Sequence, residues 1–214
     1  MGTLLAANPY AEEQIEQKKL FLIICEGENT EPYYFSSFRV PSKAVIVHGG
    51  KGSKNTLIDY ALKMQQDPDY AGREIWCVYD YDVKPDEAAT QPKDFNSSID
   101  KAYANSLKVA WSNDAFELWF LLHYHKMDNA LTREEIYKIL KERWGARSRE
   151  IKTVTFSKDH YKRHGGELSE GQALAIRRAS ELHDKFKGRK DYANHCPCTT
   201  VYQLVEELNR NLKD

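Results

Sequence analysis

Acidic residues follow two short apolar runs of the sequence. Leu20–Cys25 is a continuous apolar run, and Glu26 comes directly after it. Ile75–Tyr79 is a second such run, and Asp80 and Asp82 come after it. A short apolar run that ends abruptly in charge is typical of a strand buried on both faces. If the two strands are neighbours, the three acids lie together at one edge of a sheet.

Three carboxylates in one place repel each other unless a cation lies among them. Asp80 and Asp82 are two residues apart, so in an extended chain their side chains point the same way. Mg²⁺ suits such a site because it is held by a few carboxylates and keeps several waters. We therefore predict that Glu26, Asp80 and Asp82 hold Mg²⁺ or Mn²⁺, which can polarise a phosphate and activate a water. The alternative is that they are solvated loop residues.

From Leu20 to about residue 125 the sequence alternates between strand and helix patterns. The further strands are expected at 44–47 and 108–111, and the helices at Thr30, 57–64, 94–105 and 114–124. This alternation predicts an α/β fold with a mainly parallel four-stranded sheet flanked by helices, of the Rossmann type. Ligand sites in such sheets lie outside the carboxyl ends of the strands. The acids are expected at that edge.

The second half of the chain is predicted to be mostly helical. Helices are expected at 132–144, 168–186 and 201–212. We divide the chain into an N-terminal tail (1–18), an α/β core (19–125) and a helical extension packed on the core (126–214). No sharp linker separates the last two parts.

Composition excludes several classes of protein. The chain has 214 residues, of which 41% are hydrophobic and 29% charged, and its formal net charge is −1. It is therefore globular, without the polybasic coat of a general nucleic-acid binder. No apolar run approaches the ~20 residues of a membrane-spanning helix, and the first 19 residues lack a secretory signal pattern. We therefore expect no contact with a membrane. The four cysteines form no dense disulfide framework, so we expect the protein to lie in the cytoplasm.

Other residues extend the predicted site. Glu117 follows a strand end in a largely apolar helix, where an unpaired carboxylate is costly, so we expect it to ligate the metal or support a ligand. Lys51 and Lys54 lie in a glycine-rich loop before a helix, a setting that suits phosphate, unless the loop is only a solvated turn. Lys54 is our choice for steadying the scissile phosphate. Ser112 and Asn113 end a strand and are expected to touch a substrate phosphate.

Basic residues are frequent in the second half, and His160 and Tyr161 lie among them. Cations interleaved with aromatic rings suit a phosphate backbone and splayed bases. Acidic residues are mixed in, so a solvated helical surface is the alternative. The basic residues are Arg143, Arg147, Arg149, Lys152, Lys158, Lys162, Arg163, Arg177, Arg178, Lys185, Lys187, Arg189 and Lys190.

Four segments resemble motifs of the RloB family. Glu26–Phe35 (EGENTEPYYF) resembles its opening motif, and Asp80–Asp82 (DYD) its second. Ser112–His123 (SNDAFELWFLLH) resembles its third, and Thr199–Val205 the start of its C-terminal helix. The resemblance spans about residues 19 to 210. A Glu after the first strand and DxD after a later one also resemble the Toprim domain of topoisomerases, primases and OLD-type nucleases.

The resemblance implies a Toprim-like fold and nuclease chemistry, with Glu26, Asp80 and Asp82 at the metal positions. It also implies a place in bacterial defence loci, alongside restriction systems and beside an ABC-type ATPase. It does not name the substrate, so RNA, including tRNA, is as open as DNA.

We therefore expect a Mg²⁺- or Mn²⁺-dependent nuclease whose metal-bound water is positioned or deprotonated with help from Glu26 or Glu117. A different class of function keeps the same acids: a non-catalytic sensor or adaptor that binds a metal or nucleotide and is switched by the ATPase. A structural subunit is a third, weaker possibility, favoured if the second-half helices expose an apolar patch. The sequence leaves the oligomeric state open.

Overall fold

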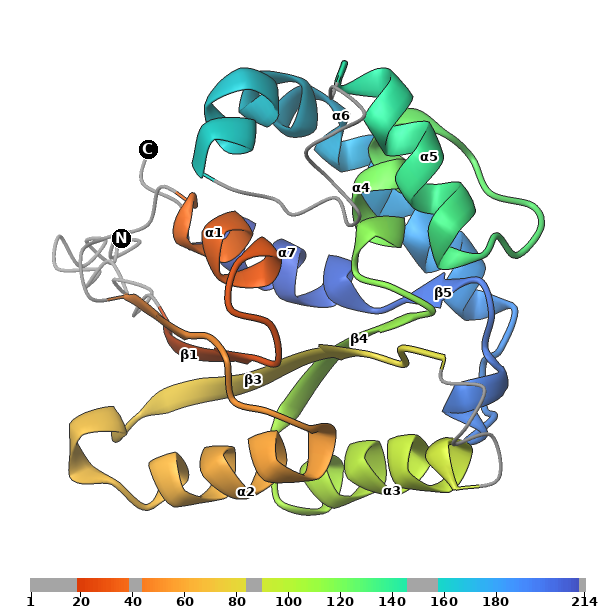
Figure 1. Cartoon of the computed structure of the whole chain (residues 1–214). Helices are drawn as coiled ribbons and strands as arrows, with labels where there is room; N and C mark the ends of the chain where they lie inside the picture. Colours follow the sequence, from red (N-terminus) through yellow and green to blue (C-terminus); the bar gives the residue numbers. More distant parts are fainter. Residues whose placement is uncertain (1–18, 39–43, 84–89, 146–157, 212–214) are drawn as a thin grey trace, which may run out of the picture.

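Alternating strands and helices build one sheet that is covered by helices on both faces (Figure 1). The structure is a computed structural model, and it describes residues 19–38, 44–83, 90–145 and 158–211. The predicted N-terminal tail lies outside the described residues, as do Arg147, Arg149 and Lys152.

The sheet has the strand order β2-β1-β3-β4-β5. Its parallel strands are β1 (Leu20–Cys25), β2 (Val45–His48), β3 (Arg73–Asp80) and β4 (Lys108–Asn113). Cys25 pairs with Val78 and Asp80 pairs with Ser112, so the carboxyl ends of β1, β3 and β4 meet at one edge. The prediction that the strands before Glu26 and Asp80 are neighbours is confirmed.

The predicted number of strands is wrong. A fifth strand, β5 (Cys198–Thr199), pairs antiparallel with β4, so the sheet is mixed, although it is mostly parallel as predicted. β5 comes from the half of the chain that was predicted to be helical. It has only two residues and directly follows Pro197, and a strand this short leaves no period-2 pattern in the sequence.

In the described part of the chain, two helices cover one face of the sheet and five lie on the other side (Figure 1). The first two are α2 (Lys54–Gln65) and α3 (Gln91–Ala104). The others are α1 (Thr30–Ser36), α4 (Glu117–Tyr124), α5 (Arg133–Arg143), α6 (Lys158–Asp184) and α7 (Val201–Asn209). Short 3₁₀ turns lie at Pro68–Tyr70 and Tyr192–Asn194. α6 begins ten residues before the predicted start at Leu168. The sequence of its first turns is polar, so these turns show no apolar helical spacing that would have predicted them.

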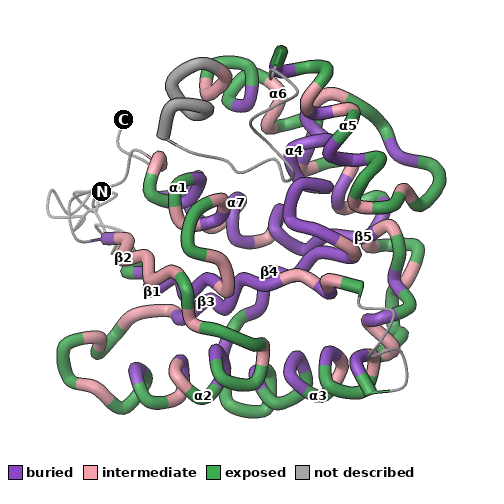
Figure 2. The backbone as a smooth tube through the Cα atoms, in the orientation of Figure 1, coloured by how far each residue is buried: buried purple, intermediate pink, exposed green. Residues whose placement is uncertain are grey.

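Side chains of the central strands alternate between two apolar cores. Phe21 and Ile23 of β1 join the core beneath α1, α4 and α7, whereas Leu22 and Ile24 join the core with α2 and α3. All four are fully buried, and Figure 2 shows the central strands almost wholly in the colour of buried residues. This two-sided burial is why the sequence of β1 is a continuous apolar run.

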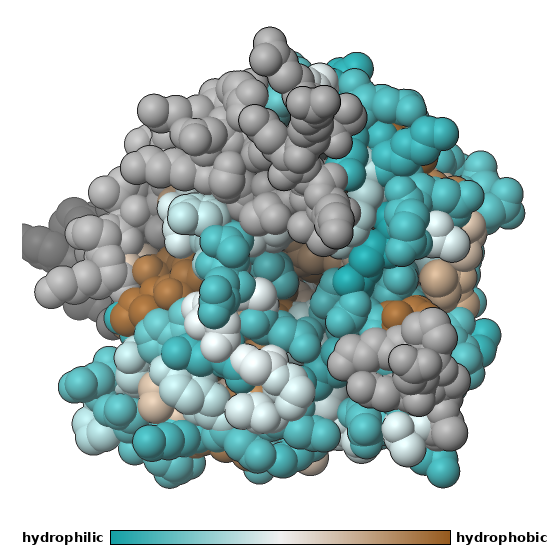
Figure 3. Space-filling view, in the orientation of Figure 1, coloured by the Kyte–Doolittle hydropathy of each residue, from teal (hydrophilic) through white to brown (hydrophobic). Residues whose placement is uncertain are grey.

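The described surface on one face of the molecule is mostly polar. On the face in Figure 3, hydrophilic residues predominate and apolar colour gathers in small separate areas. Among the described residues after 126, Leu174 is the large apolar side chain that is exposed, so little there favours the structural-subunit alternative. None of the described helices combines the length and apolarity that a membrane crossing requires.

Candidate active site at the carboxyl ends of the strands

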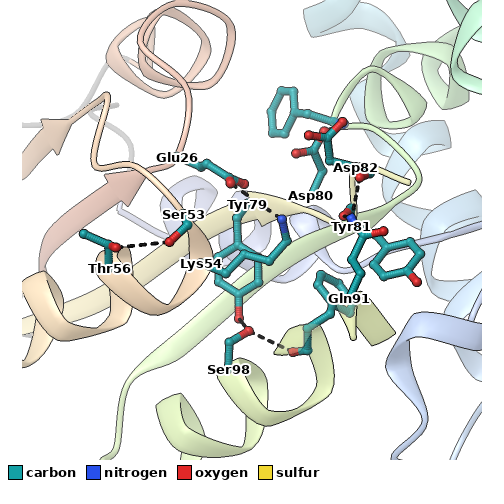
Figure 4. A network of polar contacts seen from close by, with 12 residues as sticks. Glu26, Ser53, Lys54, Thr56, Tyr79, Asp80, Tyr81, Asp82, Gln91 and Ser98 are labelled. Carbon is teal, nitrogen blue, oxygen red and sulfur yellow. Dashed lines mark hydrogen bonds and ion pairs between the residues drawn. The ribbon is translucent and has the colours of Figure 1, made fainter. Parts of the chain in front are cut away.

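The predicted acids come together at the carboxyl edge of the sheet. The backbone N–H of Glu26 donates to the carbonyl of Val78 (2.9 Å), which extends the pairing of β1 with β3 by one residue. Glu26 is thereby placed beside the end of β3, where Asp80 lies. Figure 4 shows Glu26 on one side of this edge and Asp80 and Asp82 on the other.

Asp82 has a left-handed backbone conformation and is not extended. Its φ is 54°, a conformation that Asp adopts more readily than most residues. Its backbone N–H donates to the carbonyl of Asp114 (3.0 Å), and the side-chain amide of Gln91 donates to the carbonyls of Tyr81 (2.9 Å) and Asp82 (2.5 Å). The assumption of an extended DxD segment is therefore wrong, but Asp80 and Asp82 still face a common partner, described below.

Lys54 is the first residue of α2, and its side chain points to Glu26 (Figure 4). Lys54 Nζ lies 3.6 Å from Glu26 Oε1, and both side chains are largely buried. The preceding loop is fastened to the end of β1, because Gly50 N–H donates to the Gly27 carbonyl (2.9 Å). Gly50 has a φ of 66°, which glycine adopts without strain. Lys51 instead lies over the Tyr60 ring, with Nζ 4.6 Å from the ring centroid.

Arg133 is the common partner of the two aspartates, and the sequence analysis missed it. Its guanidinium contacts Asp80 Oδ2 at 3.1 Å and Asp82 Oδ1 at 2.5 Å. It also donates to the Asp114 carbonyl at 3.1 Å and lies 3.6 Å from the Asp114 carboxylate. The pattern Thr132-Arg133-Glu134-Glu135 signals a helix start, but nothing in the sequence shows that this start faces the acids.

Two further carboxyl groups lie buried behind this edge. Glu117, the first residue of α4, is 6% exposed, and Glu31 of α1 is 7% exposed. Glu31 was not predicted as a site residue, although it lies in the same opening motif, Glu26–Phe35, as Glu26. A Cβ on Gly27 would lie 2.5 Å from Glu31 Oε2, so glycine at 27 leaves the room that the Glu31 carboxyl group occupies.

Burial and mutual repulsion raise the pKa values of these acids. Burial is the main cause for each, and it raises the pKa of Glu26 and of Glu31 to about 7 and that of Glu117 to about 8. The charge of Asp80 adds to all three shifts, whereas Lys54 opposes the shift of Glu26. Burial also raises the pKa of Asp80, and Arg133 opposes that rise. The edge is therefore a crowded set of carboxyl groups that gains from any cation nearby.

Ser112 and Asn113 do not face this edge. Both side chains are buried, and each bonds to the C-terminal segment. The Ser112 hydroxyl lies 2.8 Å from the Thr199 hydroxyl, and the Asn113 amide donates to the Ala193 carbonyl (2.8 Å). These contacts fasten β5 and the turn before it to β4. In this structure the two residues serve the fold and are not accessible to a substrate.

The residue types at this edge suit a hard divalent cation, which prefers carboxylate oxygens. Glu26 Oε2 is also buried without a hydrogen-bond partner. However, among the residues that the structure describes, no group of three or more His, Cys, Asp or Glu side chains is arranged to hold a metal ion. Arg133 lies between Asp80 and Asp82, and Lys54 lies against Glu26. The donor set fits the ion, but protein cations neutralise it here.

A cavity of about 640 Å³ lies at the opposite, amino-terminal edge of the sheet. Its lining includes Lys19, Glu74, Trp76 and Lys108, and none of the predicted site residues. The case for the candidate site is therefore made from strand topology and charge.

Comparison with known proteins identifies the family. A profile of the RloB-like protein family matches residues 21–208, which is most of the chain. The chain belongs to the RloB-like family. The matched region contains all the acids discussed above, together with Lys54 and Arg133. No curated protein and no solved structure matches the chain significantly, so a Toprim-like core remains a prediction.

Proposed function

We propose that this RloB-like protein is a metal-dependent nuclease that hydrolyses phosphodiester bonds of RNA, such as tRNA, or of DNA. One observation carries the proposal: Glu26 follows β1, Asp80 ends β3 and Asp82 follows it, so the three acids lie at the carboxyl edge of one sheet. Ligand sites of mainly parallel sheets lie at that edge. Several partly buried acids at one edge are costly unless a cation lies among them.

Glu26, Asp80 and Asp82 would hold Mg²⁺ or Mn²⁺, which when bound polarises a phosphate and activates a water. Lys54 supplies a positive charge at the amino end of α2, where it balances the negative charge that builds on a phosphate during hydrolysis. Glu117 has a pKa of about 8, so it can exchange a proton at neutral pH. The buried wall around Glu117 excludes bulk water from that side.

We further propose that the protein acts in the cytoplasm as part of a bacterial defence system, together with an ABC-type ATPase. Membership of the RloB-like family is what supports this part of the proposal. A nuclease that cuts nucleic acid of its own cell is toxic and has to be restrained, and a partner ATPase supplies a means of restraint.

A cleavage assay tests the proposal. The purified chain, with Mg²⁺ or Mn²⁺, is mixed with single-stranded DNA, double-stranded DNA or total tRNA, with and without the ATPase. We expect cutting that EDTA abolishes and that is lost in an Asp80→Asn/Asp82→Asn variant with intact circular dichroism. Asp128→Asn, an exposed aspartate outside the site, is the matched control and should cut normally.

The alternative is a non-catalytic sensor or adaptor that binds a metal or nucleotide at the acidic edge. The contacts of Arg133 and Lys54 favour it, because both protein cations already neutralise the acids. Failure to cut any of these substrates, even with the ATPase, would support the adaptor. In that case the Asp80→Asn/Asp82→Asn variant should lose binding of the ATPase or of a nucleotide.

A further inference from the structure

Arg133 is fixed in place by the start of its helix. It is the first residue of α5, directly after the N-cap Thr132. Thr132 and Glu135 form a capping box, in which each side chain accepts from the other residue's backbone N–H. The backbone of Arg133 is thus held from both sides, and its side chain reaches back to the ends of β3 and β4.

The guanidinium meets three acids and stays charged among them. Asp80 accepts a hydrogen bond from it at 3.1 Å, Asp82 Oδ1 forms an ion pair with it at 2.5 Å, and the Asp114 carboxylate lies 3.6 Å away. Burial opposes ionisation of Arg133, but the charges of the acids outweigh it, and the pKa of Arg133 rises. Its side chain is 24% exposed, so water screens these contacts only in part.

A divalent ion on Asp80 and Asp82 would compete with these contacts. Arg133 already uses Asp80 Oδ2, which also accepts from the backbone N–H of Phe116 (3.3 Å). A guanidinium and a divalent ion repel each other strongly at such distances. The two cations therefore exclude each other from the space between the aspartates.

We propose that Arg133 is the resident cation of the acidic edge, and that a divalent ion binds Asp80 and Asp82 only by displacing its guanidinium. The inference rests on the proposed function, because it assumes that Asp80 and Asp82 are the residues that bind the metal. It adds regulation to that site: the metal-free state is stabilised, and the site fills only above a threshold concentration of divalent ion. Any partner that draws Arg133 away from the aspartates lowers that threshold.

Mn²⁺ binding tests this proposal without any measurement of cleavage. Free Mn²⁺ is followed by electron paramagnetic resonance while the wild-type chain, Arg133→Gln or Arg143→Gln is titrated with MnCl₂. We expect Arg133→Gln to bind Mn²⁺ about ten- to a hundredfold more tightly, since charge-assisted hydrogen bonds no longer compete. Arg143 lies on the same helix but pairs with Glu167 (3.4 Å), so Arg143→Gln should bind as the wild type does.

Two further variants guard against simpler explanations. Asp80→Asn should abolish binding in both the wild-type and the Arg133→Gln background, which places the ion at this edge.

Arg133→Gln leaves the partly buried Asp80 without its cation and is therefore less stable in EDTA. Arg133→Lys keeps a charge but not the two-pronged donor and should fold, with an intermediate affinity for Mn²⁺. Mn²⁺ should raise the melting temperature of Arg133→Gln more than that of the wild type.

The outcomes separate this inference from the proposed function. If the wild type binds Mn²⁺ and neither Arg133 variant binds more tightly, the inference is overturned and the nuclease proposal stands. If both Arg133 variants bind more tightly but no nucleic acid is cut, even with the ATPase, the inference stands and the nuclease proposal fails. If no form of the protein binds Mn²⁺ at millimolar concentration, the inference is overturned together with the metal site.

Discussion

Replacement of Glu117 by glutamine should change how the stability of the metal-free protein depends on pH. Glu117 is buried and has a pKa of about 8, whereas an unfolded glutamate titrates near 4.5. Between these values the folded chain holds a proton that the unfolded chain has released. The free energy of unfolding therefore falls as the pH rises through this window, and Glu117→Gln removes this contribution.

The size of the effect follows from the width of the window. One group that is protonated only in the folded state contributes up to about 1.4 kcal/mol per pH unit. Between pH 5.5 and 7.5 the wild type should therefore lose up to about 2.7 kcal/mol through Glu117 alone. Glu26 and Glu31, whose pKa values are about 7, contribute further in the same direction in both proteins.

Urea denaturation in EDTA at pH 5.5, 6.5 and 7.5 measures this difference. EDTA is needed because a bound divalent ion favours the ionised carboxylates. Glu117→Gln should become more stable relative to the wild type with each step in pH. The matched control is Glu142→Gln, an exposed position on α5, which should run parallel to the wild type. If Glu117→Gln also runs parallel to it, Glu117 does not hold its proton in the folded state, and the burial argument is refuted.

Gly27→Ala should lower the free energy of unfolding by about 1–3 kcal/mol, because its Cβ would lie 2.5 Å from Glu31 Oε2. Gly166→Ala, which meets no atom within 4 Å on α6, should cost nothing in the same denaturation experiment; equal losses would contradict the crowding at Gly27. Thr132→Ala removes the capping box of α5 and should cost about 1 kcal/mol by thermal or urea unfolding, whereas an unchanged stability would mean that the cap contributes little. Lys54→Met should reduce metal-dependent cleavage about 10²-fold at saturating metal, and undiminished cleavage would remove Lys54 from the proposed chemistry.

The acidic edge could be predicted because it depends on strand topology. Parallel strands end at the same edge, so two apolar runs that each end in acid were enough to bring Glu26 and Asp80 together. Glu117 could be placed near this edge in the same way, because its helix directly follows the next parallel strand. Lys54 was predicted from the composition of the loop before α2.

The remaining features depend on how helices pack, which local patterns do not encode. Arg133 is the first residue of a helix that was predicted. The direction of its side chain, however, depends on how α5 packs against α4, which the sequence does not show. Ser112 and Asn113 were expected to touch a substrate because they end a strand, but the strand β5 and the turn before it bond to their side chains. β5 in turn is too short to leave a pattern of its own.

The most direct test of the proposed nuclease compares two glutamates of one motif. Glu26 faces Lys54 at the acidic edge, whereas Glu28 is exposed two residues further on. We would measure Mn²⁺-dependent cleavage of tRNA and DNA by Glu26→Gln and Glu28→Gln, with the ATPase present. We predict that Glu26→Gln loses at least about 10²-fold in rate and that Glu28→Gln stays within a few-fold of the wild type. Equal cleavage by the two variants would contradict a catalytic role for the acidic edge.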